Sequence, residues 1–341
     1  MIYAGDADTI TMGRTIDYTA STGERPAVRF LIIVYIGNLK QIMKIGLVDV
    51  DGHHFPNVAL MKIASWHRMK GDTVEWAFAF DEYDRIYKSK VFTFTQDDLT
   101  VYRCHDIRKG GTGYDIKSKL PMEIERHKGL AYDLYPNCRF SVQFYSRGCI
   151  RHCPFCLVYD KEGKIQSVDP MEWNPQAEWI EVLDNNFFAG QRWREAVEDL
   201  QRQGLPVKFH GVDIRIMDEE QAAALNSIRI KGYVHIAWDL PELDLTPQLE
   251  TITKYIKPCK IACYVLVGFN STHEQDLYRL RTLKRLGILP FVQPFRDYTN
   301  HRKPTQYEKD LARWANRAWL FKSMDFMEYE PRKGFRCEQY F

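Results

Sequence analysis

Apolar residues occur along the chain in short runs separated by polar or amphipathic stretches. The run KIGLVDV at 44–50 precedes a helical pattern that Pro56 can begin and Gly71 can end. The runs TVEWAFAF and KVFTFT, at 73–80 and 90–95, continue the series. Continuous apolar runs are typical of buried parallel strands. This order predicts a small parallel sheet with right-handed crossovers.

A second series follows a Pro- and charge-rich connection. Six candidate strands lie at 140–146, 178–186, 206–215, 232–239, 260–269 and 289–297. The helices between them have readable starts, since Asp218 precedes Gln221 by three residues and Thr272 precedes Gln275 by three. An eight-unit barrel typically needs about 250 residues. We therefore expect an α/β protein with a partial (β/α)6 TIM-like barrel, preceded by a small parallel-sheet α/β domain.

These patterns divide the chain into four parts. We expect an N-terminal extension that is not part of the fold, an α/β domain, a partial barrel and a helical tail, at 1–42, 43–125, 138–300 and 301–341. The extension is polar except for the run that begins at Phe30, and Met43 opens a typical α/β pattern. The tail segment LARWANRAWLFKSMDF predicts a helix with an aromatic face.

Composition and charge favour a cytoplasmic protein. The formal net charge of +2 gives no electrostatic argument for binding nucleic acid or an anionic membrane. The apolar run at Phe30 is far shorter than the roughly 20 residues that span a bilayer. It also starts too late for a signal peptide. The eight cysteines are clustered in a large chain, which indicates a metal or catalytic site in a reducing compartment.

Three of these cysteines lie close together in SRGCIRHCPFC, residues 146–156. Cys149, Cys153 and Cys156 are separated by three and then two residues. Thiolates in such a pattern hold zinc or an iron–sulfur cluster, and both usually take four protein ligands. A [4Fe–4S] cluster on three cysteines explains the missing partner, because its fourth iron stays open.

Zinc is the alternative metal, and it needs a fourth Cys or His. His152 lies between two of the cysteines, where neighbouring side chains on a tight loop rarely reach the same ion. Cys138, Cys259 and Cys263 remain as distant candidates.

The loop resembles that of the radical S-adenosylmethionine (SAM) superfamily. That signature has three cysteines at this spacing after the first barrel strand, with an aromatic residue before the third, as Phe155 is. The resemblance implies that Cys149, Cys153 and Cys156 bind three irons and that SAM chelates the fourth. One electron then cleaves the sulfonium carbon–sulfur bond and releases a 5′-deoxyadenosyl radical. It also implies a flavodoxin- or ferredoxin-type electron donor.

Further SAM contacts follow from the resemblance by position. Asp184 and Asn185 stand where the family often has Gly-Gly-Glu for the methionine amine. Asp213 and Arg215 would hold the ribose and carboxylate, and Gly268 lies in the YVLVGF stretch that resembles the strand flanking adenine. Because side chains at the carboxyl ends of strands form the site in such barrels, the substrate-side candidates are His210, Asp239 and Gln293.

The front domain resembles a cobalamin-binding domain. Asp51 and His53 match an Asp-x-His-x-x-Gly stretch whose histidine ligates cobalt, but Pro56 replaces the glycine. The glycines of GGTG, 110–113, fall where such domains approach the nucleotide tail. We expect a reduced domain that no longer binds the corrin; cobalamin binding through His53 is the alternative.

The predicted function is that of a radical SAM enzyme whose substrate is a small molecule, a peptide or RNA. One alternative is SAM-dependent methyl or methylthio transfer, with or without cobalamin. The remaining cysteines, however, do not form the second cluster motif that methylthiotransferases generally carry. The other alternative is a non-catalytic protein that uses the same loop as a metal-stabilised binding module or redox sensor.

Overall fold

The computed structural model describes residues 42–297, 300 and 302–341. The chain divides into two units, Met1–Ile42 and Met43–Phe341. The prediction for the N-terminal extension therefore lies outside the described residues, apart from Ile42. Among the helices of the described ranges, none has both the length and the apolar character needed to cross a bilayer.

The first sheet is parallel and has the order β2-β1-β3-β4. Its strands are β1 (Lys44–Asp49), β2 (Thr73–Trp76), β3 (Arg85–Ser89) and β4 (Ile107–Gly110). Helix α1 (Val58–Met69) connects β1 to β2 and buries Leu60 and Ile63 against the sheet. Asn57 caps this helix by accepting a hydrogen bond from the amide of Leu60. The predicted strand–helix–strand order is confirmed.

The strand predicted at 90–95 is wrong. This segment is a loop held by Asp51, whose carboxylate accepts hydrogen bonds from the amide of Val91 and the hydroxyl of Thr95. The strand lies earlier, at β3, where Lys88 is buried and forms an ion pair of 2.9 Å with Asp97. A buried lysine with a distant carboxylate partner gives no apolar signal in the sequence.

All six strands predicted in the second series are confirmed. They are β5 (Phe140–Gln143), β8 (Trp179–Val182), β9 (Val207–Phe209), β10 (Val234–Ala237), β11 (Ile261–Val267) and β12 (Leu289–Pro294). Their ladders are parallel and form two sheets, β5-β8-β9 and β10-β11-β12. A single bridge from Val207 to Ile230 links β9 to the chain just before β10. The fold is therefore α/β with parallel sheets.

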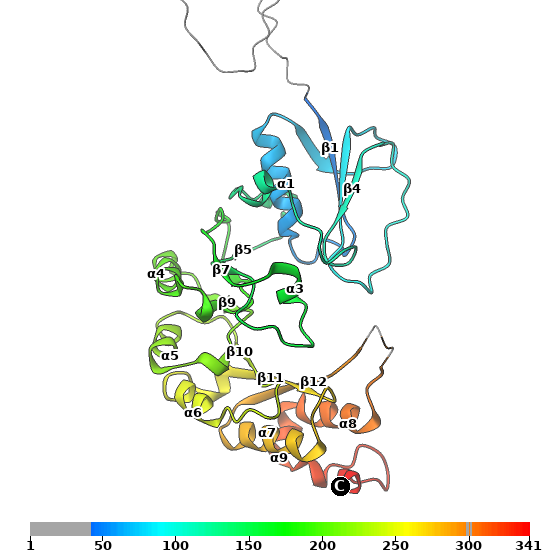
Figure 1. The fold of residues 1–341 in the computed structure, drawn as a ribbon. Coiled ribbons are helices and arrows are strands. Elements are labelled where there is room, and N and C mark those ends of the chain that lie inside the picture. Colours follow the sequence, from blue (N-terminus) through cyan, green and yellow to red (C-terminus); the bar gives the residue numbers. More distant parts are fainter. Residues whose placement is uncertain (1–41, 298–299, 301) are drawn as a thin grey trace, which may run out of the picture. The chain divides into compact units, whose positions relative to one another are not determined.

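Helices cover one face of these strands. They are α4 (Trp193–Gln203), α5 (Glu219–Asn226), α6 (Thr246–Tyr255) and α7 (His273–Arg285). Helices α4, α5 and α6 follow one another along the same side of the strands (Figure 1). The predicted starts are confirmed, since Asp218 and Thr272 both form complete capping boxes. The strand residues facing these helices, such as Ile180 and Cys263, are fully buried in one core.

The opposite face of the strands has a different composition. Strand residues alternate between faces, and residues paired in register on neighbouring strands share a face. Glu181 pairs with Lys208 on β9, and Tyr264 pairs with Phe291 on β12. His235 of β10 belongs to the same side. We call this side, defined by Glu181, Lys208, His235, Tyr264 and Phe291, the open face; Phe291 is 46% exposed on it.

The tail forms two helices where one was predicted. They are α8 (Gln306–Ala315) and α9 (Ala318–Ser323). The predicted aromatic face is present, because Trp314 packs on Phe321 and on Phe326 with ring centroids 5.0 and 5.5 Å apart. The remaining short elements are α2 (Met122–Glu125), α3 (Val158–Glu162), β6 (Ser146–Arg147) and β7 (Gln166–Ser167).

Candidate iron–sulfur site

The cysteine loop begins and ends in a short antiparallel pairing. Strand β6 pairs with β7, and the amide of Cys149 donates to the carbonyl of Gly163 over 3.2 Å. Gly148 has φ +82°, and a Cβ atom there would lie 2.5 Å from the carbonyl oxygen of Lys164. The glycine of the RGC stretch is therefore required because the returning chain passes too close for a side chain.

Glu162 holds the two ends of this loop together. Its carboxylate accepts two hydrogen bonds from the guanidinium of Arg147, at 3.1 and 2.7 Å, and one of 2.8 Å from the amide of Gly148. It also accepts a bond of 2.9 Å from the side-chain amide of Asn185, which follows β8. Burial alone would raise the pKa of Glu162, but these bonds and the charge of Arg147 hold it below the ordinary value.

The three cysteines are free thiols of intermediate exposure. Burial, followed by the nearby Cys153, Cys149 and Asp239, raises the pKa of the Cys156 thiol. Within the described ranges, no group of three or more His, Cys, Asp or Glu side chains is arranged to hold a metal ion. The thiols are therefore neighbours on one loop but do not already occupy ligand positions.

Aromatic contacts place the loop against the carboxyl ends of the last strands. Phe155 packs edge-on against Phe269, which follows β11, with ring centroids 5.3 Å apart. Phe269 in turn contacts Phe295, which follows β12, at 4.9 Å. The aromatic residue before the third cysteine therefore connects the loop to two strand ends that lie more than a hundred positions later in the sequence.

Charged contacts connect the loop to the end of β9. Asp213 caps a 3₁₀ turn and accepts two hydrogen bonds from the guanidinium of Arg215, at 2.6 and 3.1 Å. It also accepts a bond of 2.8 Å from Arg151, which lies in the loop. The second terminal nitrogen of Arg215 lies 3.8 Å from the sulfur of Cys153. Burial would raise the pKa of Asp213, but the two arginines hold it low.

The side chains of Asp184 and Asn185 are both engaged. Asp184 accepts a hydrogen bond of 2.9 Å from the amide of Tyr145 and one of 2.5 Å from the hydroxyl of Ser146. It is 1% exposed, and burial raises its pKa to about 6. Asn185 donates to Glu162. Both residues thus position the start of the cysteine loop, and their assignment to the methionine group of SAM stays a prediction.

Two further candidates lie at neighbouring strand ends. Gly268 has φ +76°, and a Cβ atom there would collide with the ion pair between Arg302 and Glu308. Asp239 follows β10, and burial raises its pKa although the charge of Arg215 opposes the rise. Asp239 is also near enough to influence Cys156. The structure therefore brings Gly268 and Asp239 to the same edge of the sheets as the cysteine loop.

His210 and Gln293 belong to the open face rather than to the cysteine loop. His210 follows β9 directly and hydrogen-bonds to Glu181. Gln293 lies on β12 in register with Leu266 and is exposed. Glu181 was missed because a single acidic residue inside an apolar run gives no motif, and Glu162 was missed because it lies in the polar segment YDKEGK, where charged residues are ordinary.

Loops next to the first sheet carry further candidates. His53 stacks on Trp76 with ring centroids 4.1 Å apart, and Asp51 is occupied with residues 91–95. The predicted turn at GGTG is confirmed, and its Thr112 hydroxyl accepts a hydrogen bond of 2.5 Å from Lys161 of α3. This contact connects the turn after β4 to the helix that follows the cysteines. The prediction that this part of the chain no longer binds the corrin is untested, and cobalamin binding through His53 stays the alternative.

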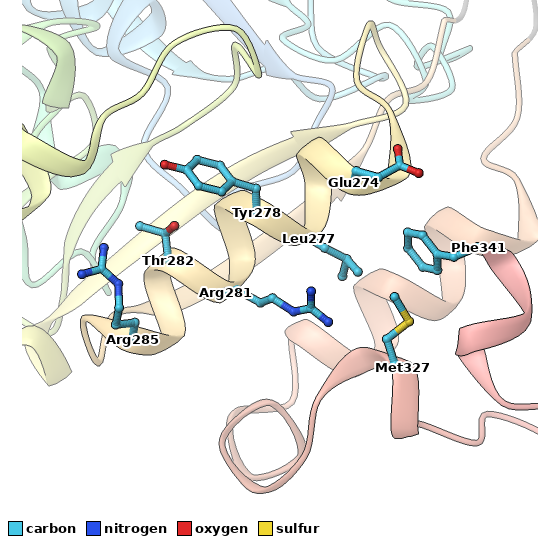
Figure 2. A pocket seen from close by; sticks show the side chains of 8 residues that line it. All are labelled: Glu274, Leu277, Tyr278, Arg281, Thr282, Arg285, Met327 and Phe341. Carbon is cyan, nitrogen blue, oxygen red and sulfur yellow. The ribbon is translucent and has the colours of Figure 1, made fainter.

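A hollow of about 360 Å³ lies elsewhere, on the outer side of α7. Leu277 of α7 points toward Met327 and Phe341 there, and Arg281 lines the same hollow (Figure 2). Its lining includes neither a cysteine nor a residue at the end of a strand. We therefore do not assign it to the candidate site.

No protein-family model and no curated protein matches this chain. The residues of the cysteine loop and of the strand ends are therefore the basis for assigning a function.

Proposed function

We propose that this protein is a radical SAM enzyme. The observation that supports this most strongly is the position of Cys149, Cys153 and Cys156. They lie on the loop after β5, the first of six strands that follow one another along the chain in two parallel sheets. This loop contacts residues that follow β9 and β11. In an α/β arrangement, residues beyond the carboxyl ends of the strands form the active site. The six strands would then be the partial barrel expected from the sequence.

The donor set suits the proposed cluster. Three free thiols on one loop are the ligands that iron–sulfur clusters take, although the described residues contain no preformed group of three or more metal ligands. A [4Fe–4S] cluster bound there would supply the electron that breaks the carbon–sulfur bond of SAM, received from a flavodoxin- or ferredoxin-type donor. The fourth iron would be left for the SAM amine and carboxylate.

The chain's own residues have defined tasks in this proposal. Glu162 and Arg147 fix the ends of the loop, and the three thiols would move together onto the irons when the cluster binds. Arg215, already neutralised by Asp213, would direct its remaining N–H groups toward the sulfur of Cys153 and toward the SAM carboxylate. Phe155, Phe269 and Phe295 would exclude water from that side.

The cysteine variants test this proposal. After anaerobic reconstitution of the full chain with iron and sulfide, the wild-type protein should bind about four irons per chain. Cys149→Ala, Cys153→Ala and Cys156→Ala should each lose the cluster absorbance and all SAM cleavage. Cys259→Ala is the matched control, because Cys259 is an exposed free thiol outside the loop.

A cluster that survives all three loop variants would contradict the proposal. So would a colourless protein that binds one zinc, which would favour the non-catalytic metal module.

A further inference from the structure

The open face concentrates cationic side chains around one buried carboxylate. Glu181 is 4% exposed and accepts a hydrogen bond from His210 and another, of 2.8 Å, from the indole N–H of Trp179. The ammonium of Lys208 lies 3.5 Å from the same carboxylate. Burial would raise the pKa of Glu181, but the hydrogen bonds from His210 and Trp179 and the charge of Lys208 hold it low. Both oxygens of the Glu181 carboxylate therefore already have hydrogen-bond or ion-pair partners within the chain.

A second ammonium group lies near this carboxylate, beside the ring of Trp179. Lys231 places its ammonium 3.8 Å above the ring of Trp179. Burial lowers the pKa of His235, and the charges of Lys208 and His210 lower it further. Basic side chains that lie close together make protonation of one another less favourable. A bound anion would favour their protonated forms and would in turn be attracted by them.

Aromatic rings form one wall beside these cations. Tyr264 stacks on His235 with ring centroids 5.6 Å apart, and Phe291 meets Tyr264 edge-on at 5.4 Å. Phe291 and Tyr233 are 46% and 42% exposed, although both are large and apolar. A planar ring can stack on such surfaces while its anionic group meets the cations.

The cationic cluster and the cysteine loop lie on the same side of β10. His235 lies on β10, and Asp239 follows two residues after the strand ends at Ala237. Tyr264 lies on β11, and Phe269, just after the end of this strand, contacts Phe155 of the cysteine loop. A ligand held at the cluster can therefore extend toward the cysteine loop.

We propose that the open face binds a small molecule that joins a planar ring to an anionic group, a carboxylate or a phosphate, with the anion at Lys208, His210 and His235. Charge complementarity selects the anion, and the half-buried Tyr264 and the exposed Phe291 select the ring. This ligand is the substrate if the proposed radical SAM function holds, and to that extent the inference rests on it.

Two small probes test the site in the full chain, before any cluster is reconstituted. Benzoate and phenyl phosphate each carry a ring, and they separate the carboxylate from the phosphate. Histidine ring signals in NMR spectra report binding, and the signal of His210 is assigned by its loss in His210→Gln. At low ionic strength we expect at least one probe to shift the His210 and His235 signals saturably. Lys208→Gln should lower the affinity for that probe at least tenfold. Tyr264→Leu should also lower this affinity. The matched control is Lys309→Gln, on the exposed side of α8, which should bind like the wild type.

The outcomes separate the two proposals. Saturable binding of benzoate alone supports a carboxylate ligand, and binding of phenyl phosphate alone supports a phosphate ligand. No saturable shift with either probe overturns the anion site, and so does equal affinity in Lys208→Gln and Lys309→Gln. Because the titration needs no cluster, probe binding without SAM cleavage would leave the anion site standing and remove the radical function. SAM cleavage without probe binding would support the radical function and remove the anion site.

Discussion

Glu162→Gln removes the charge that holds the two ends of the cysteine loop together while keeping the size of the side chain. The wild-type carboxylate accepts four hydrogen bonds, two of them from Arg147, and its side chain is 14% exposed. A glutamine can accept only through its carbonyl oxygen, and its amide group would face N–H donors.

Oε2 accepts three of these hydrogen bonds and Oε1 accepts one, so at least one bond is lost when the amide nitrogen takes the place of Oε1. Bonds to charged groups contribute roughly 1.5–3 kcal/mol each, and the unpaired Arg147 adds a desolvation cost. We expect the loop to lose about 3 kcal/mol of local stability, which is roughly a hundredfold in its opening equilibrium. The matched control is Glu178→Gln, because Glu178 also accepts two bonds from one arginine but is 58% exposed. An exposed pair contributes about 0–1 kcal/mol.

Amide hydrogen exchange measures this locally. Peptides that cover residues 147–163 should exchange roughly a hundredfold faster in Glu162→Gln than in the wild type, while Glu178→Gln leaves them unchanged. Equal exchange of this segment in the two variants would refute the assignment of Glu162 as the residue that closes the loop.

Three further predictions concern the same framework. Arg279 is fully buried and bonds to Asp276 and to the carbonyl of Trp238, so Arg279→Met should cost about 3–5 kcal/mol in urea unfolding. Arg281→Met, which breaks an exposed pair, should cost at most about 1 kcal/mol; equal costs would contradict this. The pKa of Asp184 is about 6 in the folded protein and 3.8 in the unfolded chain, so the folded protein favours the protonated carboxyl. As the pH rises from 3.8 through 6, this carboxyl ionises in its buried position and the free energy of unfolding falls. Relative to wild type, Asp184→Asn should therefore gain about 3 kcal/mol between pH 3.5 and pH 7 in urea unfolding, and a constant difference would rule this out. Gly148→Ala should prevent cluster loading, because the added Cβ would collide with the backbone at Lys164. The control is Gly163→Ala: Gly163 also has a positive φ, +78°, but no atom lies within 4 Å of an added Cβ. This variant should cost only roughly 1–3 kcal/mol of backbone strain and still load iron.

The sequence predicts the second series of strands well because each strand buries a continuous apolar side. Ile180, Val207 and Cys263 face the helices, and this face alone produces the visible runs. The open face leaves no such signal, since Lys208 and His235 occupy alternate positions among apolar residues and read as interruptions. Strand β3 was missed for the same reason, because Lys88 is buried only with the help of Asp97.

The sequence predicts the candidate metal ligands of the site but not the residues that position the loop carrying them. Three closely spaced cysteines are visible in any reading of the chain. Glu162 and Asp213 act through contacts with Arg147, Arg151 and Arg215, and those pairings depend on how the loop folds back. Asp184 was expected near SAM from its position after a strand, yet its hydrogen bonds go to Tyr145 and Ser146. Such pairings require the three-dimensional structure.

The most direct test of the radical SAM proposal is the product formed from SAM by the reconstituted, reduced full chain under anaerobic conditions. The proposal predicts 5′-deoxyadenosine and methionine in equal amounts from the wild-type protein, and neither from Cys153→Ala. A wild-type protein that carries its cluster and is fully reduced, yet leaves SAM intact, would contradict it.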